Sequence, residues 1–247
     1  MKKYILYILL ITFSVTVYSQ NKVTISADAN DDNLIIEKIG NQINKGYLDE
    51  NGKRTGCWRE YNHQDILKGI SEYSNGILNG VTIKMDQQGN LNKEMFYING
   101  KLNGEYREYL RGLYIIELAN YKEGILHGKY YKKYENNPKI SMEESFYKNG
   151  NKHGVSRWYT DKGILIAEYL YNEGKFEGAN KTFYENGKIM IEEVFENNIP
   201  ISYTEYYENG KIKLKGEYKD GKKEGVWVQY SEDGSSKKLK YQNGELK

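Results

Sequence analysis

The sequence predicts an all-β protein of tandem β-hairpin repeats, arranged as a long antiparallel meander or an open, solenoid-like sheet. Two observations support this fold class. A pair of glycines recurs at a nearly constant period, and two columns of mostly aromatic residues keep a fixed distance from it. From Gly52 to Gly174, successive units are 24 or 26 residues apart. A fixed period in the twenties is typical of a stacked repeat array.

The repeat unit is defined by the spacing Gly-x-x-x-Gly. The pairs are Gly52/Gly56, Gly76/Gly80, Gly100/Gly104, Gly124/Gly128, Gly150/Gly154, Gly174/Gly178 and Gly221/Gly225. One degenerate unit has Asn198 and Ser202 at these positions and keeps the sequence register. The residues three before each first glycine are Tyr73, Tyr97, Tyr121, Tyr147, Tyr171, Phe195, Tyr218 and Tyr241. The residues five after each second glycine are Tyr61, Met85, Tyr109, Lys133, Tyr159, Phe183, Tyr207 and Tyr230.

Each unit carries two turn signals, such as Asn149-Gly150 and Asn186-Gly187. Asn-Gly pairs supply the positive φ angles of two-residue hairpin turns, so we expect such turns at both ends of a unit. Runs such as Glu94 to Tyr97 place apolar residues on both faces of a strand. This pattern favours a single twisted sheet over a two-layer sandwich. We expect the second glycine of a pair to bend the strand or to let an aromatic ring lie across the backbone.

Three regions follow from the pattern. Residues 1–19 resemble a secretory signal peptide, with Lys2 and Lys3 before an apolar stretch and a cleavage site between Ser19 and Gln20. We therefore expect export to the periplasm or the cell exterior. An uncleaved anchor is the alternative, although the apolar stretch is short for a membrane span. Residues 20–46 lie outside the repeat and are assigned as an N-terminal cap. Residues 47–247 form an array of about eight repeats.

The balance of charge bears on the partners. Without Lys2 and Lys3, the 36 basic residues fall to 34, which equals the number of acidic residues. A nucleic-acid-binding protein needs a basic surface, so nucleic acid is not an expected partner. Membrane contact is not expected either, apart from the signal segment. The single cysteine, Cys57, is interpreted as an ordinary strand residue, because it has no second cysteine to pair with.

The units Tyr121–Gly128 and Tyr147–Gly154 carry the pattern Y-x-x-G-x-x-x-G and end in His-Gly. They resemble MORN repeats, and more narrowly the bacterial variant found in YwqK-type antitoxin proteins. The resemblance covers residues 47–247. It implies an all-β hairpin array without known catalysis that contacts proteins or membranes. The antitoxin label implies neutralisation of a toxin by binding, and with export this becomes an immunity-type role in the cell envelope.

No constellation of residues predicts catalysis, a cofactor or a metal site, so the protein is not expected to be an enzyme. His127 and His153 occupy one repeat position and are interpreted as turn residues rather than ligands. No Cys/His cluster has the spacing of a zinc site. The candidate binding residues are the aromatics Trp58, Tyr109, Trp158 and Trp227.

The main functional hypothesis is a non-catalytic, exported repeat protein that binds another protein through its long sheet. The alternatives are an envelope antitoxin or immunity-type protein and a module that binds cell-wall glycan. Glycan binding predicts tryptophan at one fixed repeat position. Trp58 and Trp227 share a position, whereas Trp158 lies two residues later and the other units have none. Packing within hairpins is the preferred interpretation of the tryptophans.

Overall fold

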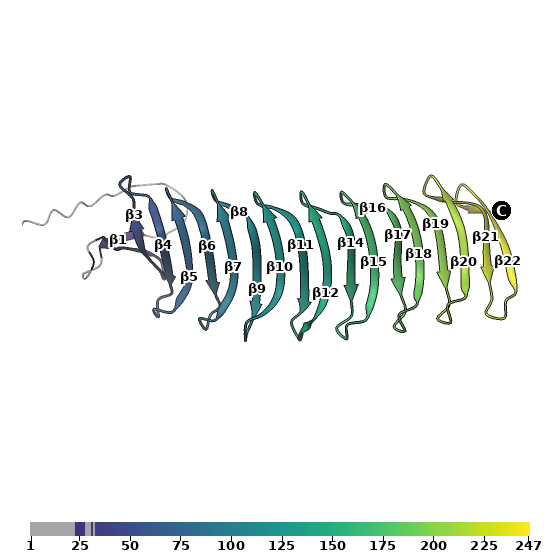
Figure 1. Cartoon of the computed structure of the whole chain (residues 1–247), viewed down its shortest axis with the longest axis horizontal. Coiled ribbons are helices and arrows are strands. Elements are labelled where there is room, and N and C mark those ends of the chain that lie inside the picture. The colour runs from purple at the N-terminus through teal and green to yellow at the C-terminus, as the bar shows by residue number, and fades with distance from the viewer. Residues whose placement is uncertain (1–22, 28–30, 32) are drawn as a thin grey trace, which may run out of the picture.

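The computed structural model describes residues 23–27, 31 and 33–247, so the signal segment at 1–19 and its cleavage site lie outside the described residues. The described chain is all-β and forms one open antiparallel sheet (Figure 1). Consecutive strands pair along the array in meander order. The predicted fold class is therefore confirmed: the hairpins form one open antiparallel sheet with its strands in meander order.

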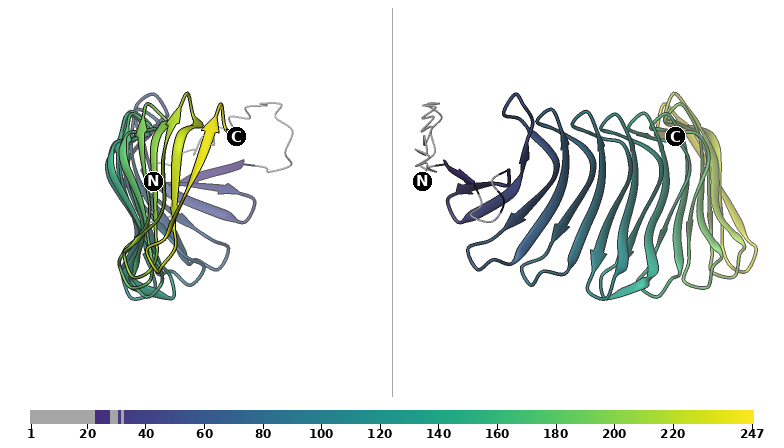
Figure 2. Two further views of the ribbon diagram at one scale, coloured as in Figure 1. Left: turned by 90° about the vertical axis from the view of Figure 1, so that its right-hand side faces the viewer. Right: turned by 60° about the vertical axis from the view of Figure 1, so that its left-hand side comes forward.

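The strands take their bounds from the two turns of each repeat. They are β1 (Val23–Ala27), β2 (Ile35–Ile39), β3 (Gln42–Leu48), β4 (Arg54–Tyr61), β5 (Leu67–Ser74), β6 (Ile77–Met85), β7 (Leu91–Ile98), β8 (Lys101–Leu102), β9 (Gly104–Leu110), β10 (Tyr114–Lys122), β11 (Ile125–Tyr134), β12 (Asn137–Lys148), β13 (Asn151–Lys152), β14 (Gly154–Tyr159), β15 (Leu165–Asn172), β16 (Lys175–Phe176), β17 (Gly178–Phe183), β18 (Ile189–Glu196), β19 (Ile199–Tyr206), β20 (Ile212–Lys219), β21 (Lys222–Tyr230), β22 (Ser236–Gln242) and β23 (Glu245–Leu246). The strands bow in the same sense along the sheet (Figure 2).

The turn after the first aromatic column is a two-residue hairpin turn, as predicted. In one example, Lys148 pairs with Asn151 across the turn, and Asn149 and Gly150 have φ angles of 51° and 84°. Both central residues therefore have the positive φ of a type I′ turn. This geometry explains why Asn, Asp or Glu followed by Gly recurs at this end of the units.

The turns at the opposite edge differ from the prediction. At Asp86 to Asn90, the Gly89 N–H donates to the Asp86 carbonyl, and the Asp86 N–H donates to the Asn90 carbonyl. This is a three-residue loop in which Gly89 has a positive φ of 85° and Gln88 does not. The Asp86 carboxylate accepts from the Gln88 and Asn90 N–H groups, each at 2.9 Å. This side-chain cap stabilises the longer loop, so a two-residue turn is wrong here.

Backbone hydrogen bonds join most of the two-residue turns to the preceding unit, and we call these bonds rungs. A type I′ turn leaves its two central N–H groups without an acceptor in their own hairpin. The carbonyl two residues after the preceding turn accepts one of them, at 2.7–3.0 Å. The rungs run from Gly76 to Arg54, Gly100 to Leu78, Gly124 to Leu102, Gly150 to Leu126, Gly174 to Lys152, Asn198 to Phe176 and Gly244 to Lys223.

Side chains before the second glycine accept the other turn N–H. The Asn149 N–H donates to Nδ1 of His127, and the Glu173 N–H donates to Nδ1 of His153, both at 3.4 Å. Elsewhere the Asn197 N–H donates to the Glu177 carboxylate at 3.0 Å. These histidines therefore act as turn residues in a specific way: each accepts a hydrogen bond from the turn of the following unit.

A second set of bonds connects the units at the opposite edge. The hydroxyls of Tyr134, Tyr184 and Tyr207 donate to the carbonyls of Tyr159, Tyr206 and Tyr230, at 2.6–2.8 Å. Each donor is a tyrosine near the end of one hairpin, and each acceptor is about one unit further along the chain. Hydrogen bonds therefore connect neighbouring units at both long edges of the sheet, and at this edge they do so where these three tyrosines occur.

The core of the sheet is a thin column on one face, which we call the inner face. Its most buried side chains stand two residues after a second glycine. Trp58, Thr82, Ser156, Asn180 and Trp227 are each at most 5% exposed. Ala119 and Ser145, at 0% and 8%, lie on the strands that pair with this column. Most of the column is too small or too polar for a thick hydrophobic core, so the repeated edge bonds matter more here.

The degenerate unit keeps its turn but not its strand register. Asn197 and Asn198 have φ angles of 51° and 70°, so the two-residue turn forms without glycine. The following bulge is one residue shorter than in other units, because Phe195 pairs with Pro200 and Val194 with Ser202. The rung from Gly221 to Pro200 is missing among the described residues. At this junction the two units are therefore joined by strand pairing without a rung.

The segment assigned as a cap consists of strands of the same sheet. Val23–Ala27 forms β1, which pairs with β2. The stretch Leu34 to Ile43 contains β2 and the start of β3, joined at Gly40. These strands continue the meander into β4, and a capping role for residues 20–46 stays a prediction.

Deletion of residues 218–247 tests the dependence on neighbouring units. Because each strand pairs only with its neighbours, we expect the shortened chain to keep β-type circular dichroism and to unfold at lower denaturant concentration. Complete loss of the β signal would contradict a quasi-linear array.

Candidate binding surface

Two of the four predicted binding residues are internal. Trp58 and Trp227 are 3% and 0% exposed and lie flat on strand backbone. Their Nε1–H groups donate to the carbonyls of Tyr47 and Glu217, at 3.0 and 3.1 Å. Their rings cover glycines of the neighbouring strand, so closely that a Cβ at Gly216 would lie 2.1 Å from Trp227. In this arrangement neither ring has a free face for a ligand.

A cation covers the ring of every tryptophan. Arg54, Lys152 and Lys223 lie 4.3, 4.4 and 4.2 Å from the ring centroids of the tryptophans in their own units. The same three cations reach the tyrosine of the next strand, at 5.2–5.7 Å. In the units without tryptophan this position holds Leu78, Leu102, Leu126, Phe176 or Pro200. Tryptophan and cation therefore occur as a pair, which indicates a structural use of both.

The other two candidates are half-buried. Trp158 packs against Tyr169 with ring centroids 5.2 Å apart and lies under Lys152. Tyr109 donates its hydroxyl to the Glu94 carboxylate, which also pairs with Arg107 at 3.4 Å. Equivalent bonds join Tyr159 to Glu144 and Tyr206 to Glu192. The structure therefore does not gather the four predicted residues into one site.

The packing of the tryptophans involves strand glycines that the sequence pattern did not single out. Gly46 and Gly216 precede Tyr47 by one residue and Tyr218 by two, and they belong to no Gly-x-x-x-Gly pair. Their position outside the Gly-x-x-x-Gly pairs was the sequence feature that could have indicated this packing.

The second glycine of a pair was predicted to bend the strand or to let an aromatic ring lie across the backbone. Gly104 fits this prediction, because its φ is 107° and the Phe96 ring would lie 3.8 Å from an added Cβ.

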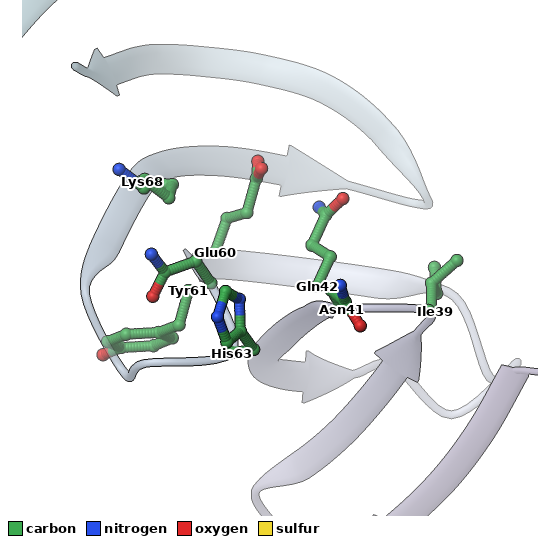
Figure 3. A pocket seen from close by; sticks show the side chains of 9 residues that line it. Ile39, Asn41, Gln42, Glu60, Tyr61, His63 and Lys68 are labelled. Carbon is green, nitrogen blue, oxygen red and sulfur yellow. The ribbon is translucent and has the colours of Figure 1, made fainter. Parts of the chain in front are cut away.

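A shallow hollow of about 520 Å³ lies between the β2–β3 and β4–β5 turns (Figure 3). It is wide open and its charged lining groups already have partners. Glu60 pairs with Lys84 at 2.7 Å, and the Lys68 ammonium donates to the Asp86 carbonyl at 2.8 Å. His63 also lines it. The hollow holds no nucleophile and base in contact, so it offers no catalytic arrangement to describe.

In the part of the chain that the structure describes, no three His, Cys, Asp or Glu side chains come together as a possible metal site. No helix in residues 23–27, 31 and 33–247 is long and apolar enough to cross a membrane.

The sheet face opposite the buried column, which we call the outer face, carries exposed apolar side chains. Five of them lie on neighbouring strands from β12 to β18 and form what we call the apolar row. The row consists of Phe146, Val155, Leu170, Ala179 and Val194. Phe146 and Val155 are each 41% exposed, and the other three are partly exposed. A continuous apolar strip on a single-layer sheet is the best candidate for a binding surface.

Comparison with known proteins agrees with the repeat geometry. The family described as the MORN repeat variant matches residues 176–197 and 202–220. These two segments are therefore identified as MORN repeats. The two matched segments include β17 and β18 in one unit and most of β19 and β20 in the next, so each MORN match covers one hairpin. A search of curated proteins finds no match.

Substitution of Gly216 by alanine tests the packing of the MORN units against Trp227. The added methyl would overlap the fully buried ring, so we expect a loss of about 1–3 kcal/mol in the free energy of unfolding. Gly69→Ala is the matched control, because Gly69 is also a strand glycine and its nearest neighbour would lie 3.1 Å away. Equal destabilisation by the two variants, measured by denaturant titration, would show that ring packing on Gly216 is unimportant.

Alkaline pH should lower the free energy of unfolding of the repeat array. Burial raises the pKa of Tyr171 and of Tyr203 to about 12 from the usual 10.0. The folded chain therefore holds phenolic protons that the unfolded chain releases, and stability falls as pH rises from 10 towards 12. We expect the denaturation midpoint to decrease in this window, and less steeply in Tyr203→Phe. An unchanged slope in that variant would contradict a contribution from Tyr203.

Proposed function

We propose that the protein is a non-catalytic, exported interaction module whose sheet binds another protein. The observation that carries the proposal is the apolar row on the outer face. Its side chains stay exposed although the hairpins around them are fully paired. MORN repeats suggest contacts with proteins or membranes, and the row gives such a contact a physical basis.

A protein partner fits this surface better than a membrane. The row is bordered by carboxylates as well as cations, with Glu144, Glu168 and Glu192 on the outer face two residues from Phe146, Leu170 and Val194. An anionic membrane surface attracts basic segments and not evenly mixed charge. Export rests on the signal-like pattern of residues 1–19, and a toxin as the partner would make the protein an envelope immunity factor.

Affinity capture tests the proposal. The purified chain of residues 20–247 is immobilised and exposed to cell-envelope proteins, and retained proteins are identified by mass spectrometry. An unrelated β protein of zero net charge serves as the control bait. We expect one dominant protein that resists moderate salt and, once purified, binds the chain in calorimetry.

Retention of no specific protein, or of a protein that fails to bind when purified, would contradict the proposal. Binding of cell-wall fragments in place of protein would favour the glycan module. Loss of toxin activity on binding would identify the partner as a toxin.

A further inference from the structure

The apolar row has the shape of a narrow strip across the strands. Registers fix its continuity, since Val155 pairs with Leu170 and Ala179 pairs with Val194. Glu144 pairs with Arg157, which places Phe146 opposite Val155 two residues further along. The row ends at β19, where the residue paired with Val194 is the polar Ser202. Neighbouring strands are about 4.8 Å apart, so the five strands give a strip about 19 Å long and one side chain wide.

The strip has sharp borders. Towards β11 and β10, Lys129 and Asn120 interrupt the apolar side chains. Along its length runs a row of alternating charges, two residues from each apolar member. This charged row consists of Glu144, Arg157, Glu168, Lys181 and Glu192. Arg157 contacts Glu168 at 2.7 Å and Lys181 contacts Glu192 at 3.8 Å, so the row is ordered and nearly neutral.

These dimensions exclude a second copy of the sheet as the occupant. A stable dimer buries about 800 Å² on each partner, which is far more than a strip one side chain wide can provide. An extended strand also fits poorly. Its side chains on one face repeat every 6.8 Å or so, and its backbone would find no free sheet edge with which to bond.

An α-helix fits both the spacing of the apolar side chains and the absence of a free sheet edge. Its backbone bonds are satisfied internally, and its pitch of about 5.4 Å nearly matches the spacing of about 4.8 Å between strands. One helical turn then lies over each strand, and about 13 residues cover the strip. The alternating charged row would face one flank of the helix, where residues repeat at i, i+3 and i+4.

We propose that the apolar row binds an amphipathic helix of a partner protein, laid across β12 to β18. The helix carries a narrow apolar stripe of four or so turns. The flank beside the charged row carries Lys, Glu, Lys, Glu and Lys in successive turns, opposite Glu144, Arg157, Glu168, Lys181 and Glu192. This inference rests on the proposed function and specifies which part of a protein partner is bound.

Two synthetic peptides provide the probe. Both contain about 16 residues of identical composition. One has leucines at helical spacing with the alternating flank described above, and the other has the same residues rearranged to alternate apolar and polar at strand spacing. Binding to the full chain of residues 20–247 is followed by fluorescence anisotropy. We expect the helical peptide to bind and to become helical on binding, and the rearranged peptide to bind at least tenfold or so more weakly.

The chain offers a matched pair of variants. Val155 and Val226 are both exposed valines one residue after a second glycine, at 41% and 53%, but only Val155 belongs to the apolar row. Val155→Glu should weaken binding of the helical peptide about tenfold or more, whereas Val226→Glu should leave it unchanged. Phe146→Glu is a second variant in the row, should Val155→Glu fail to fold by circular dichroism.

Three results would overturn the helix proposal: no binding of the helical peptide, equal binding of the two peptides, or equal effects of the two valine variants. A captured partner that binds wild type and Val155→Glu equally would also overturn it, while leaving the interaction module intact. Failure to capture any protein contradicts the proposed function itself, so the two failures are distinguishable.

Discussion

The architecture depends on the two N–H groups that each type I′ turn leaves without an acceptor in its own hairpin. The preceding unit supplies both acceptors in the clearest units. Gly150 donates to the Leu126 carbonyl at 2.8 Å and Asn149 donates to His127 at 3.4 Å. In an isolated hairpin only water could bond these N–H groups, whereas in the array the preceding unit supplies the acceptors. The rungs therefore couple most hairpins to the one before, and they align the two-residue turns along one edge of the sheet.

This coupling allows a sheet with a thin core to stay ordered. Ser156 and Asn180 occupy buried positions that a thicker core would fill with large apolar residues. Tryptophan fills the same column at Trp58 and Trp227, each covered by a cation of its own unit. The inner face is thereby closed by its own side chains. The outer face keeps its apolar side chains exposed, and this division between faces makes it the surface available to a partner.

The repeat, the two-residue turns and the single sheet could be predicted because each depends on local sequence, such as Asn149-Gly150. The three-residue loop at Gly89 was not predicted. Its glycine indicates a turn but not the length of the loop, which depends on side-chain hydrogen bonds to Asp86. Packing was the preferred interpretation of the tryptophans, and Trp58 and Trp227 are indeed buried, but their packing on Gly46 and Gly216 depends on the pairing of neighbouring strands. The apolar row could not be predicted, because it requires the registers between β12 and β18.

Amide hydrogen exchange resolved by residue tests the central claim most directly, because the repeat contains its own control. Gly100, Gly124, Gly150 and Gly174 donate rungs, whereas Gly221 occupies the same position and has no rung to Pro200 among the described residues. The account predicts slow exchange at the four donors and much faster exchange at Gly221. Equal exchange at all five glycines would contradict the claim that rungs couple the units.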